Sequence, residues 1–311
     1  MKRLFSAVAL LTLFSAFWTI TNVHAAGAPA QPHHAAAQQA AVAGSKGYVG
    51  SDTCLTCHAD IGKNFPENPH SRLALMHGGK GLTCESCHGP GQAHVESGGD
   101  PTKVLFNFDK MSPQQIDARC LTCHTGAHPN FERSPHGKAG VSCLSCHSVH
   151  KAMVSENLLK QPQPQLCESC HADVKLAFAQ PFHHKVPEGM MKCTDCHDPH
   201  GTFQSTQLRS TADQNAICTK CHTETAGPFV YEHPVVKTEG CVSCHSPHGS
   251  PNPRLLKVSN VNTLCLQCHS ASMNFTEPGA PGFHNQATQY QACTICHTQV
   301  HGSNTSSVFF K

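Results

Sequence analysis

Residues 193–201 read CTDCHDPHG, and the first five letters are a Cys-x-x-Cys-His pattern that occurs ten times along the chain. The ten copies use all 20 cysteines, so none remains for a disulfide, a zinc site or a nucleophile. Two thiols one helical turn apart can add to the two vinyl groups of one porphyrin, while the adjacent imidazole reaches the iron. The sequence therefore predicts ten covalently bound haem c groups, each containing iron.

The residues of these sites follow directly from the pattern, and we number the motifs 1 to 10 in chain order. The cysteine pairs are Cys54 and Cys57, Cys84 and Cys87, Cys120 and Cys123, Cys143 and Cys146, Cys167 and Cys170, Cys193 and Cys196, Cys218 and Cys221, Cys241 and Cys244, Cys265 and Cys268, and Cys293 and Cys296. The proximal iron ligands are His58, His88, His124, His147, His171, His197, His222, His245, His269 and His297. Zinc sites and disulfides also use Cys-x-x-Cys pairs, but they do not require a histidine after every second cysteine.

A second set of ten histidines falls at regular positions between the motifs. Odd-numbered motifs are followed, 11 to 15 residues after their own histidine, by His70, His136, His183, His233 and His284. Even-numbered motifs carry a closer one, His94, His150, His200, His248 and His301, in runs such as CHSVH, CHDPHG and CHSPHG. Ten irons thus have ten candidate sixth ligands, and the pattern indicates a two-haem repeat present five times.

The sequence restricts the pairing of irons and spare histidines only in part. His150, His200 and His248 follow a proximal ligand by three residues and cannot easily reach the far face of the same haem, so we expect each to bind a neighbouring one. Which spare histidine serves which iron stays open. His184 adjoins His183 and could replace it, although the spacing of 12 residues favours His183.

Other side chains fit axial ligation less well. His77 and His128 read as surface residues. Methionine is the rival ligand, but no methionine recurs at the repeat spacing among Met76, Met111, Met153, Met190, Met191 and Met273. Methionine ligation raises the reduction potential of a haem relative to two histidines, so we expect uniformly low-potential, six-coordinate irons.

The chain divides into three parts. Residues 1–25 resemble a signal peptide, because Lys2 and Arg3 precede an apolar run and Val23-His24-Ala25 offers a cleavage site. An uncleaved membrane anchor is the alternative, but the run is short and interrupted. Residues 26–47 are rich in Ala, Gln, Pro and Gly and predict a flexible linker, in which His33 and His34 are linker residues. Residues 48–311 form the decahaem domain, with repeats at about 48–100, 101–153, 154–204, 205–252 and 253–311.

The composition predicts a fold built around its cofactors. The one tryptophan, Trp18, lies in the predicted signal peptide, and the chain contains 3 Tyr and 15 Phe. A side-chain core of ordinary size is therefore not expected. We expect a multihaem cytochrome c with a haem core, mostly loops with short α-helices at the CxxCH motifs, little or no β structure, and an elongated chain of haems. Aliphatic pairs such as Leu158-Leu159 and Leu255-Leu256 are predicted to pack on porphyrin edges.

The charge of the chain and the expected coordination of the irons restrict the classes of function that fit this sequence. The chain has 22 Lys and Arg, of which two lie in the predicted signal peptide, against 20 Asp and Glu, and haem propionates would make the loaded protein acidic. No basic patch indicates nucleic acid. Haem catalysis needs an open coordination position, but there is no CxxCK motif and each iron has a candidate partner. Because only 23 to 36 residues separate successive motifs, we expect near-contact haems that transfer electrons stepwise, without enzymatic activity.

The ten motifs, the signal peptide, residues 50–58 (GSDTCLTCH) and the CHxPHG runs resemble the decahaem MtrA/DmsE family of porin-cytochrome conduits. The resemblance covers the chain after Gly47. It implies two histidine ligands at all ten irons and insertion through an outer-membrane β-barrel porin. It also implies electron exchange with periplasmic and extracellular multihaem cytochromes, or with an external acceptor or donor such as metal oxides. The family's usual division into two five-haem halves does not match the two-haem repeat.

Three functions are consistent with the sequence. The first is the conduit, exported to the periplasm and associated with the outer membrane through its barrel partner. Ten near-contact haems exceed the apolar core of a bilayer, about 30 Å thick, and a barrel would shield the polar loops from lipid. The second is a soluble periplasmic electron carrier that donates to a terminal reductase. The third is a reductase or a filament-forming wire.

Overall fold

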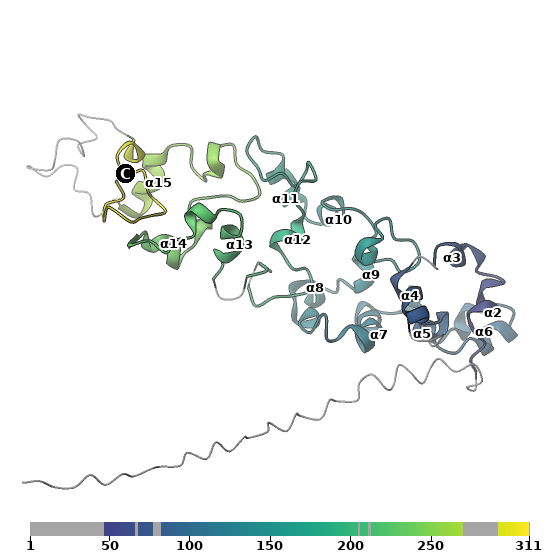
Figure 1. The fold of residues 1–311 in the computed structure, drawn as a ribbon. Helices are drawn as coiled ribbons and strands as arrows, with labels where there is room; N and C mark the ends of the chain where they lie inside the picture. The colour runs from purple at the N-terminus through teal and green to yellow at the C-terminus, as the bar shows by residue number, and fades with distance from the viewer. Residues whose placement is uncertain are drawn as a thin grey trace, which may run out of the picture.

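The computed structural model describes residues 47–65, 68–76, 82–204, 206–210, 213–269 and 292–310. The predicted signal peptide and nearly all of the predicted linker lie outside these ranges, as do His77, His284 and Met273. Within the described ranges the molecule is elongated. The chain passes from the region of α2 (Ser51–Leu55) at one end to the C-terminal segment at the other (Figure 1).

Short helices account for most of the regular structure. The further α-helices are α3 (Ala59–Asn64), α4 (Pro69–Met76), α5 (Cys84–His88), α6 (Gln92–Glu96), α7 (Pro113–His124), α8 (Pro135–Lys138), α9 (Cys143–Cys146), α10 (Gln165–Glu168), α11 (Ala172–Phe178), α12 (Cys193–Cys196), α13 (Ala216–Thr219), α14 (Pro234–Thr238) and α15 (Val261–His269). The 3₁₀ helices are η3 (Pro101–Lys103), η4 (Phe108–Lys110), η5 (Phe131–Arg133), η6 (Glu156–Leu158), η7 (Thr223–Thr225), η8 (Cys241–Ser243), η9 (Pro253–Leu255) and η11 (Cys293–Ile295). The two short strands are β1 (Tyr231–Glu232) and β2 (Gly302–Ser303), which pair antiparallel.

Local capping explains where these helices begin. In α7, Ser112 accepts a hydrogen bond from the Gln115 N–H at 3.3 Å, and Gln115 Oε1 accepts from the Ser112 N–H at 2.8 Å. This reciprocal pair satisfies two N–H groups that a helix start otherwise leaves without partners, and Pro113 suits the first helical position. The predicted fold class is confirmed: short helices surround the motifs, and β structure in the described residues is limited to one two-stranded sheet and a few isolated bridges.

A loop that folds back follows several even-numbered motifs. After motif 4, the Ser148 N–H donates to Leu158 O at 2.8 Å and the Lys160 N–H donates to Cys146 O at 2.9 Å. The same two bonds recur after motif 6 and motif 8. The turn needs positive φ angles at its tip, for example 53° at Leu158. This loop contains the leucine pairs that we expected on porphyrin edges.

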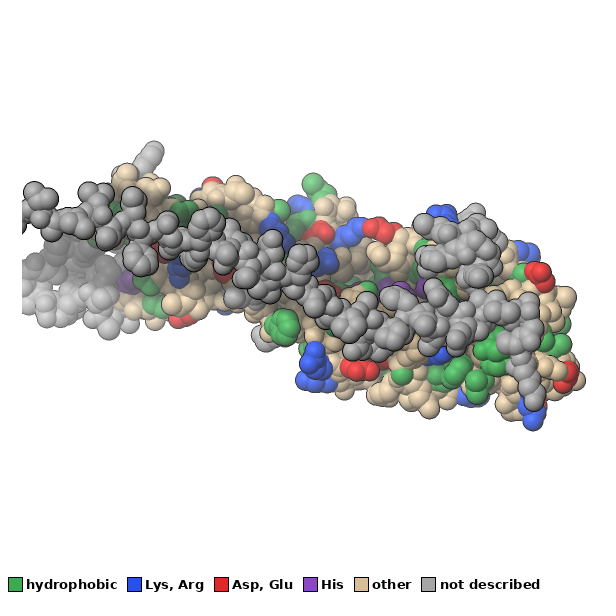
Figure 2. All heavy atoms as spheres, turned by 60° about the horizontal axis from the view of Figure 1, so that its bottom comes forward, with side chains coloured by type: hydrophobic (Ala, Val, Ile, Leu, Met, Phe, Trp, Pro, Cys, Tyr) green, Lys and Arg blue, Asp and Glu red, His purple; other side chains and the backbone are tan. Residues whose placement is uncertain are grey.

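The side-chain core is small. The buried apolar side chains of the described residues are Ile116, Phe131, Phe178, Val186 and Ile217. Charged side chains of both signs are interspersed on the surface, and histidines are visible between neighbouring segments (Figure 2). No helix in the described part of the chain has the length and apolar character of a membrane span. The polypeptide therefore gains little stability from side-chain burial alone.

Candidate haem sites and their axial histidines

Each CxxCH motif forms one helical turn. The N–H of the motif histidine donates to the carbonyl of the first cysteine at 3.0 Å in motifs 1, 4, 5, 6, 7 and 10, and at 3.1 Å in motif 8. This bond brings the two thiols and the imidazole of one motif to the same turn of backbone. All 20 cysteines lie in the described residues, and none forms a disulfide. The geometry suits attachment of one porphyrin per motif.

The first cysteines of an odd motif and of the next even motif lie together. The interacting pairs are Cys54 with Cys84, Cys120 with Cys143, Cys167 with Cys193, Cys218 with Cys241, and Cys265 with Cys293. A hydrogen bond from Cys167 lowers the pKa of the Cys193 thiol to about 7, and one from Cys218 lowers the pKa of Cys241 to about 7. Burial, followed by the neighbouring Cys84, raises the pKa of the Cys54 thiol to about 11.

The second cysteine of an even motif lies near the following odd motif. Charge interactions link Cys87 to Cys120 and Cys123, Cys146 to Cys170, Cys196 to Cys221, and Cys244 to Cys268. Together with the first-cysteine pairs, these contacts make each motif the neighbour of the motifs before and after it. The attachment sites thus follow one another in sequence order along the molecule.

Nine motif histidines each lie opposite a second histidine ring. The pairs, with the distance between ring centres, are His58–His94 (6.3 Å), His88–His150 (6.0 Å), His124–His70 (5.9 Å), His147–His200 (6.1 Å), His171–His136 (6.0 Å), His197–His248 (5.9 Å), His222–His184 (6.2 Å), His245–His301 (6.2 Å) and His269–His233 (6.2 Å). A metal held between two imidazole nitrogens at about 2 Å each separates the ring centres by roughly 6 Å. The paired rings therefore fit a haem iron between them.

The pairing follows a simple rule along the chain. Even motifs 2, 4, 6 and 8 face the close downstream histidine of the even motif two places later, so that His147 faces His200. Odd motifs 3, 5, 7 and 9 face a histidine from the segment after the odd motif two places earlier, so that His171 faces His136. Motif 1, at the end of the array, faces His94 from the segment after motif 2.

Hydrogen bonds at Nδ1 orient the rings and leave Nε2 available. In the five even motifs, Nδ1 of the proximal histidine lies 2.5 to 3.2 Å from a backbone carbonyl: Phe106 for His88, Asn157 for His147, Thr206 for His197, Arg254 for His245 and Val308 for His297. Among the opposing histidines, His136 bonds Pro199 O at 3.0 Å and His233 bonds Val300 O at 2.8 Å. Such outer contacts fix the orientation of a ligating imidazole and raise its basicity.

The structure places His184, and not the predicted His183, opposite His222. Nδ1 of His184 bonds Pro247 O at 2.7 Å, the counterpart of the bond from His136 to Pro199. Both ring nitrogens of His183 have other partners: Nδ1 lies 2.6 Å from Gln180 O and Nε2 lies 3.1 Å from Glu188 Oε1. His183 thus packs against its own loop, and His184 replaces it as the candidate sixth ligand at this site.

His128, predicted as a surface residue, instead lies between two motifs. Its ring stacks on His200 with the centres 3.9 Å apart, and it lies 6.1 Å from His124. The His128 N–H donates to His124 O at 3.0 Å, which keeps His128 on the same turn as that residue. Burial lowers the pKa of His128.

Burial also favours the neutral form of several opposing histidines. The pKa values of His70, His150, His200, His248 and His301 are all lowered, in each case chiefly by burial. Neutral imidazole is the form that binds metals, so these environments suit axial ligands.

One recurring contact was missed from sequence. Three residues before the first cysteine of an odd motif, a side-chain oxygen accepts the N–H of the first cysteine of the next even motif. The bonds are Ser51 to Cys84 (3.2 Å), Asp117 to Cys143 (2.8 Å), Asn215 to Cys241 (2.9 Å) and Asn262 to Cys293 (2.8 Å). In the remaining pair this position is Pro164, and Gln163 bonds the Thr194 N–H at 3.2 Å instead. Alignment of the repeats on their cysteines could have shown this polar position.

A second missed residue is Glu85, inside motif 2. Its side chain accepts the N–H groups of Val49, Gly50 and Gly91 at 2.8 to 2.9 Å, and it is 4% exposed. Glu85 therefore ties the beginning of the described chain to the first two motifs.

Comparisons with known proteins identify the family of the chain. The family described as "Doubled CXXCH motif" matches residues 135–176, 183–227 and 233–274, and "Cytochrome c554 and c-prime" matches residues 15–89 and 99–148. Each doubled segment holds an even motif and the next odd motif, so its frame is offset by one motif from the predicted repeats.

The chain is 33% identical to the multiheme cytochrome MtrA of Shewanella baltica over 269 residues, which cover 82% of this chain and 79% of the relative. It is 28% identical to the C-type polyheme cytochrome OmcC of Geobacter sulfurreducens, over 56% of this chain and 26% of the relative. It is 29% identical to the cytochrome c-type protein NrfB of Escherichia coli, over 39% of this chain and 64% of the relative. These similarities and the paired motifs show a haem-binding electron-transfer protein, and the chain belongs to the family of MtrA-like multihaem c-type cytochromes.

Proposed function

We propose that this chain is the electron-conducting subunit of an outer-membrane porin-cytochrome conduit. The observation that carries the proposal is the sequence-ordered row of attachment sites along an elongated molecule (Figure 1). In such a row, electrons can enter at one end and leave at the other. Likeness to MtrA over most of both chains supports the same reading.

The proposed cofactors are ten haem c groups, one per motif, bound through the 20 cysteines. The proposed axial ligands are the nine pairs of facing histidines, with His184 in place of His183. We assign His284 to the iron of His297, because the other nine candidates already face a motif histidine. His284 lies outside the described residues. With this assignment, each of the ten motif histidines has one opposing histidine, including those of motifs 1 and 10 at the two ends of the array.

Each bound haem would supply a one-electron Fe(III)/Fe(II) couple. The paired histidines would hold the iron between them, the Nδ1 contacts orient their imidazoles, and the fold keeps successive sites next to each other. With two histidines bound, a substrate would have to displace one of them to reach the iron. This closed coordination supports electron transfer and argues against enzymatic activity.

A β-barrel porin is the proposed partner. The surface carries interspersed charges, and the loops would leave backbone groups without partners in lipid (Figure 2). An enclosing barrel would remove that conflict across an apolar core about 30 Å thick. We therefore propose export to the periplasm, association with the outer membrane through the barrel, and electron exchange with periplasmic and extracellular multihaem cytochromes.

Co-purification tests the conduit. Outer membranes should be solubilised in mild detergent, and this chain should be isolated through an affinity tag after residue 311. We expect a β-barrel protein in stoichiometric amount, together with low-spin haem signals in electron paramagnetic resonance (EPR) spectra. Recovery of the chain from the periplasmic fraction without a barrel would overturn the proposal.

A soluble periplasmic carrier that donates to a terminal reductase is the second candidate. It is favoured by the match to NrfB, which covers 39% of this chain. Fractionation separates the two, because a carrier would remain in the soluble periplasm when the outer membrane is removed.

A further inference from the structure

Two carboxylates near motif 4 occupy positions that hold uncharged residues at the other even motifs. Both contact groups that hold the same proposed iron. One lies beside Cys143 and the other beside His200, which faces His147.

The first carboxylate is Asp117. It is 6% exposed, and its Oδ1 accepts the Cys143 N–H at 2.8 Å. The equivalent positions before motifs 8 and 10 hold neutral Asn215 and Asn262, and motif 6 uses neutral Gln163. A negative charge is thus buried at motif 4 where these other motifs have an amide.

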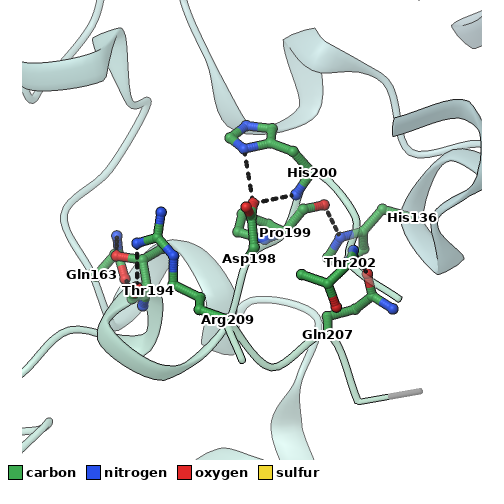
Figure 3. A network of polar contacts seen from close by, with 9 residues as sticks. All are labelled: His136, Gln163, Thr194, Asp198, Pro199, His200, Thr202, Gln207 and Arg209. Carbon is green, nitrogen blue, oxygen red and sulfur yellow. Dashed lines mark hydrogen bonds and ion pairs between the residues drawn. The ribbon is translucent and has the colours of Figure 1, made fainter. Parts of the chain in front are cut away.

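The second carboxylate is Asp198 (Figure 3). Its Oδ1 lies 3.2 Å from His200 Nδ1 and accepts the His200 N–H at 3.0 Å. The residue two places before the opposing histidine is Ser148 at motif 2 and Ser246 at motif 6. A carboxylate bonded to Nδ1 increases the basicity of a ligating imidazole more than a neutral partner does.

Nearby cations do not offset this difference. Lys160 donates its N–H to Cys146 O, but Arg209 and Lys257 occupy the same position at motifs 6 and 8, and all three side chains are exposed. Arg119 lies two residues from Asp117, yet its guanidinium binds the carbonyls of Ser86 and Cys87 in motif 2. Stacked His128 carries no hydrogen bond to either carboxylate in the described contacts.

We infer that Asp117 and Asp198 lower the reduction potential of the iron between His147 and His200 relative to the potential it would have with uncharged residues at these two positions. Both carboxylates favour Fe(III) over Fe(II), because the oxidised iron carries the extra positive charge. Burial of Asp117 reduces the screening of its charge by water. This inference rests on the proposed function.

The test is an EPR-monitored redox titration of the haem-loaded protein at pH 7. Asp117→Asn and Asp198→Asn each keep the side-chain shape and remove one charge. Each variant should raise the midpoint potential of the low-spin iron between His147 and His200, and the double variant should raise it further. The reciprocal Ser246→Asp variant should lower the potential of a different iron, the one between His197 and His248. Glu132→Gln, which removes an exposed charge, is the matched control and should shift neither iron.

The outcomes separate this inference from the proposed function. If the titrations of both aspartate variants and of Ser246→Asp coincide with that of the unmodified protein, the inference is overturned while the low-spin spectrum still supports the conduit. If the unmodified protein shows high-spin, five-coordinate iron at motif 4, the ligand assignment itself is wrong and the inference fails with it. Asp198→Asn and Ser246→Asp change partly exposed positions, so they remain informative even if Asp117→Asn folds poorly.

Discussion

Odd and even motifs share the five-residue CxxCH pattern, but the local backbone structure around them differs. Even motifs begin a short helix and are followed by a folded-back loop or turn, whose carbonyl bonds Nδ1 of the motif histidine. Odd motifs instead lie at or near the C-terminal end of a helix, as in α7 and α15. The chain thus uses one attachment chemistry in two structural settings, and the setting decides where each opposing histidine originates.

The relative orientation of the facing rings also differs among the motifs. In motifs 2, 4 and 8 the facing imidazole planes are 18° to 27° apart, whereas in motifs 3, 5 and 7 they are 64° to 79° apart. Motif 6 is intermediate at 40°, and the odd motifs 1 and 9 resemble the even motifs at 19° and 22°. The angle between the two facing imidazoles therefore varies along the row of sites.

The largest expected effect is loss of a sixth ligand. His248→Ala should convert the iron on Cys193 and Cys196 to high spin, because His248 faces His197. His184→Ala should do the same to the iron on Cys218 and Cys221. EPR of the oxidised protein measures both. His183→Ala is the control and should leave the spectrum low-spin, since both of its ring nitrogens have non-metal partners. A high-spin signal in His183→Ala would reverse the assignment.

The next largest effect should come from disturbing the contact between the loop after an even motif and the segment after an odd motif. A Cβ at Gly249 would lie 1.9 Å from Ala177 O, so Gly249→Ala must displace that backbone. Overpacking of this kind costs typically about 1–3 kcal/mol. We expect a lower Tm for the haem-loaded variant in thermal unfolding monitored by circular dichroism. Gly126→Ala is the control, because no atom lies within 4 Å of a Cβ there. Equal Tm values for the two variants would contradict the packing.

A smaller loss should follow from cutting one odd-to-even hydrogen bond. Asn215→Ala leaves the Cys241 N–H without its acceptor and also removes the bond to Val236 O. An unsatisfied, partly buried donor costs about 1–3 kcal/mol. Gln214→Ala, next to it, removes one exposed bond to Glu239 O and should change stability by less than about 0.5 kcal/mol. Chemical denaturation of the loaded protein would compare the two, and equal losses would argue against a special role for Asn215.

The smallest expected effect concerns the EPR spectrum and can be measured on the unmodified protein. The angle between axial imidazole planes sets the splitting of the iron d orbitals, so near-parallel and near-perpendicular pairs differ in their low-spin g values. We expect two families of low-spin EPR signals, with motifs 3, 5 and 7 in the near-perpendicular family. A single homogeneous low-spin signal would contradict the presence of two ring orientations.

Much of the site was predictable because its chemistry is local. Two thiols and an imidazole within five residues need one helical turn, so each CxxCH motif could be recognised without tertiary structure. The loop-rich fold with short helices also followed, since a side-chain core of ordinary size is not expected for a chain with 6% aromatic residues. Choosing between His183 and His184 was a different problem. It depends on Pro247, 63 residues away, which accepts the bond from His184 Nδ1.

The sequence by itself determined the number and place of the attachment motifs, because these depend on covalent chemistry between near neighbours in the chain. Only the tertiary structure decided which histidine faces which motif, why motif 4 has two carboxylates beside its ligands, and how His128 comes to stack on His200. Those contacts join segments that are tens of residues apart. Their formation depends on how successive loops fold back on one another, which the spacing of residues alone does not specify.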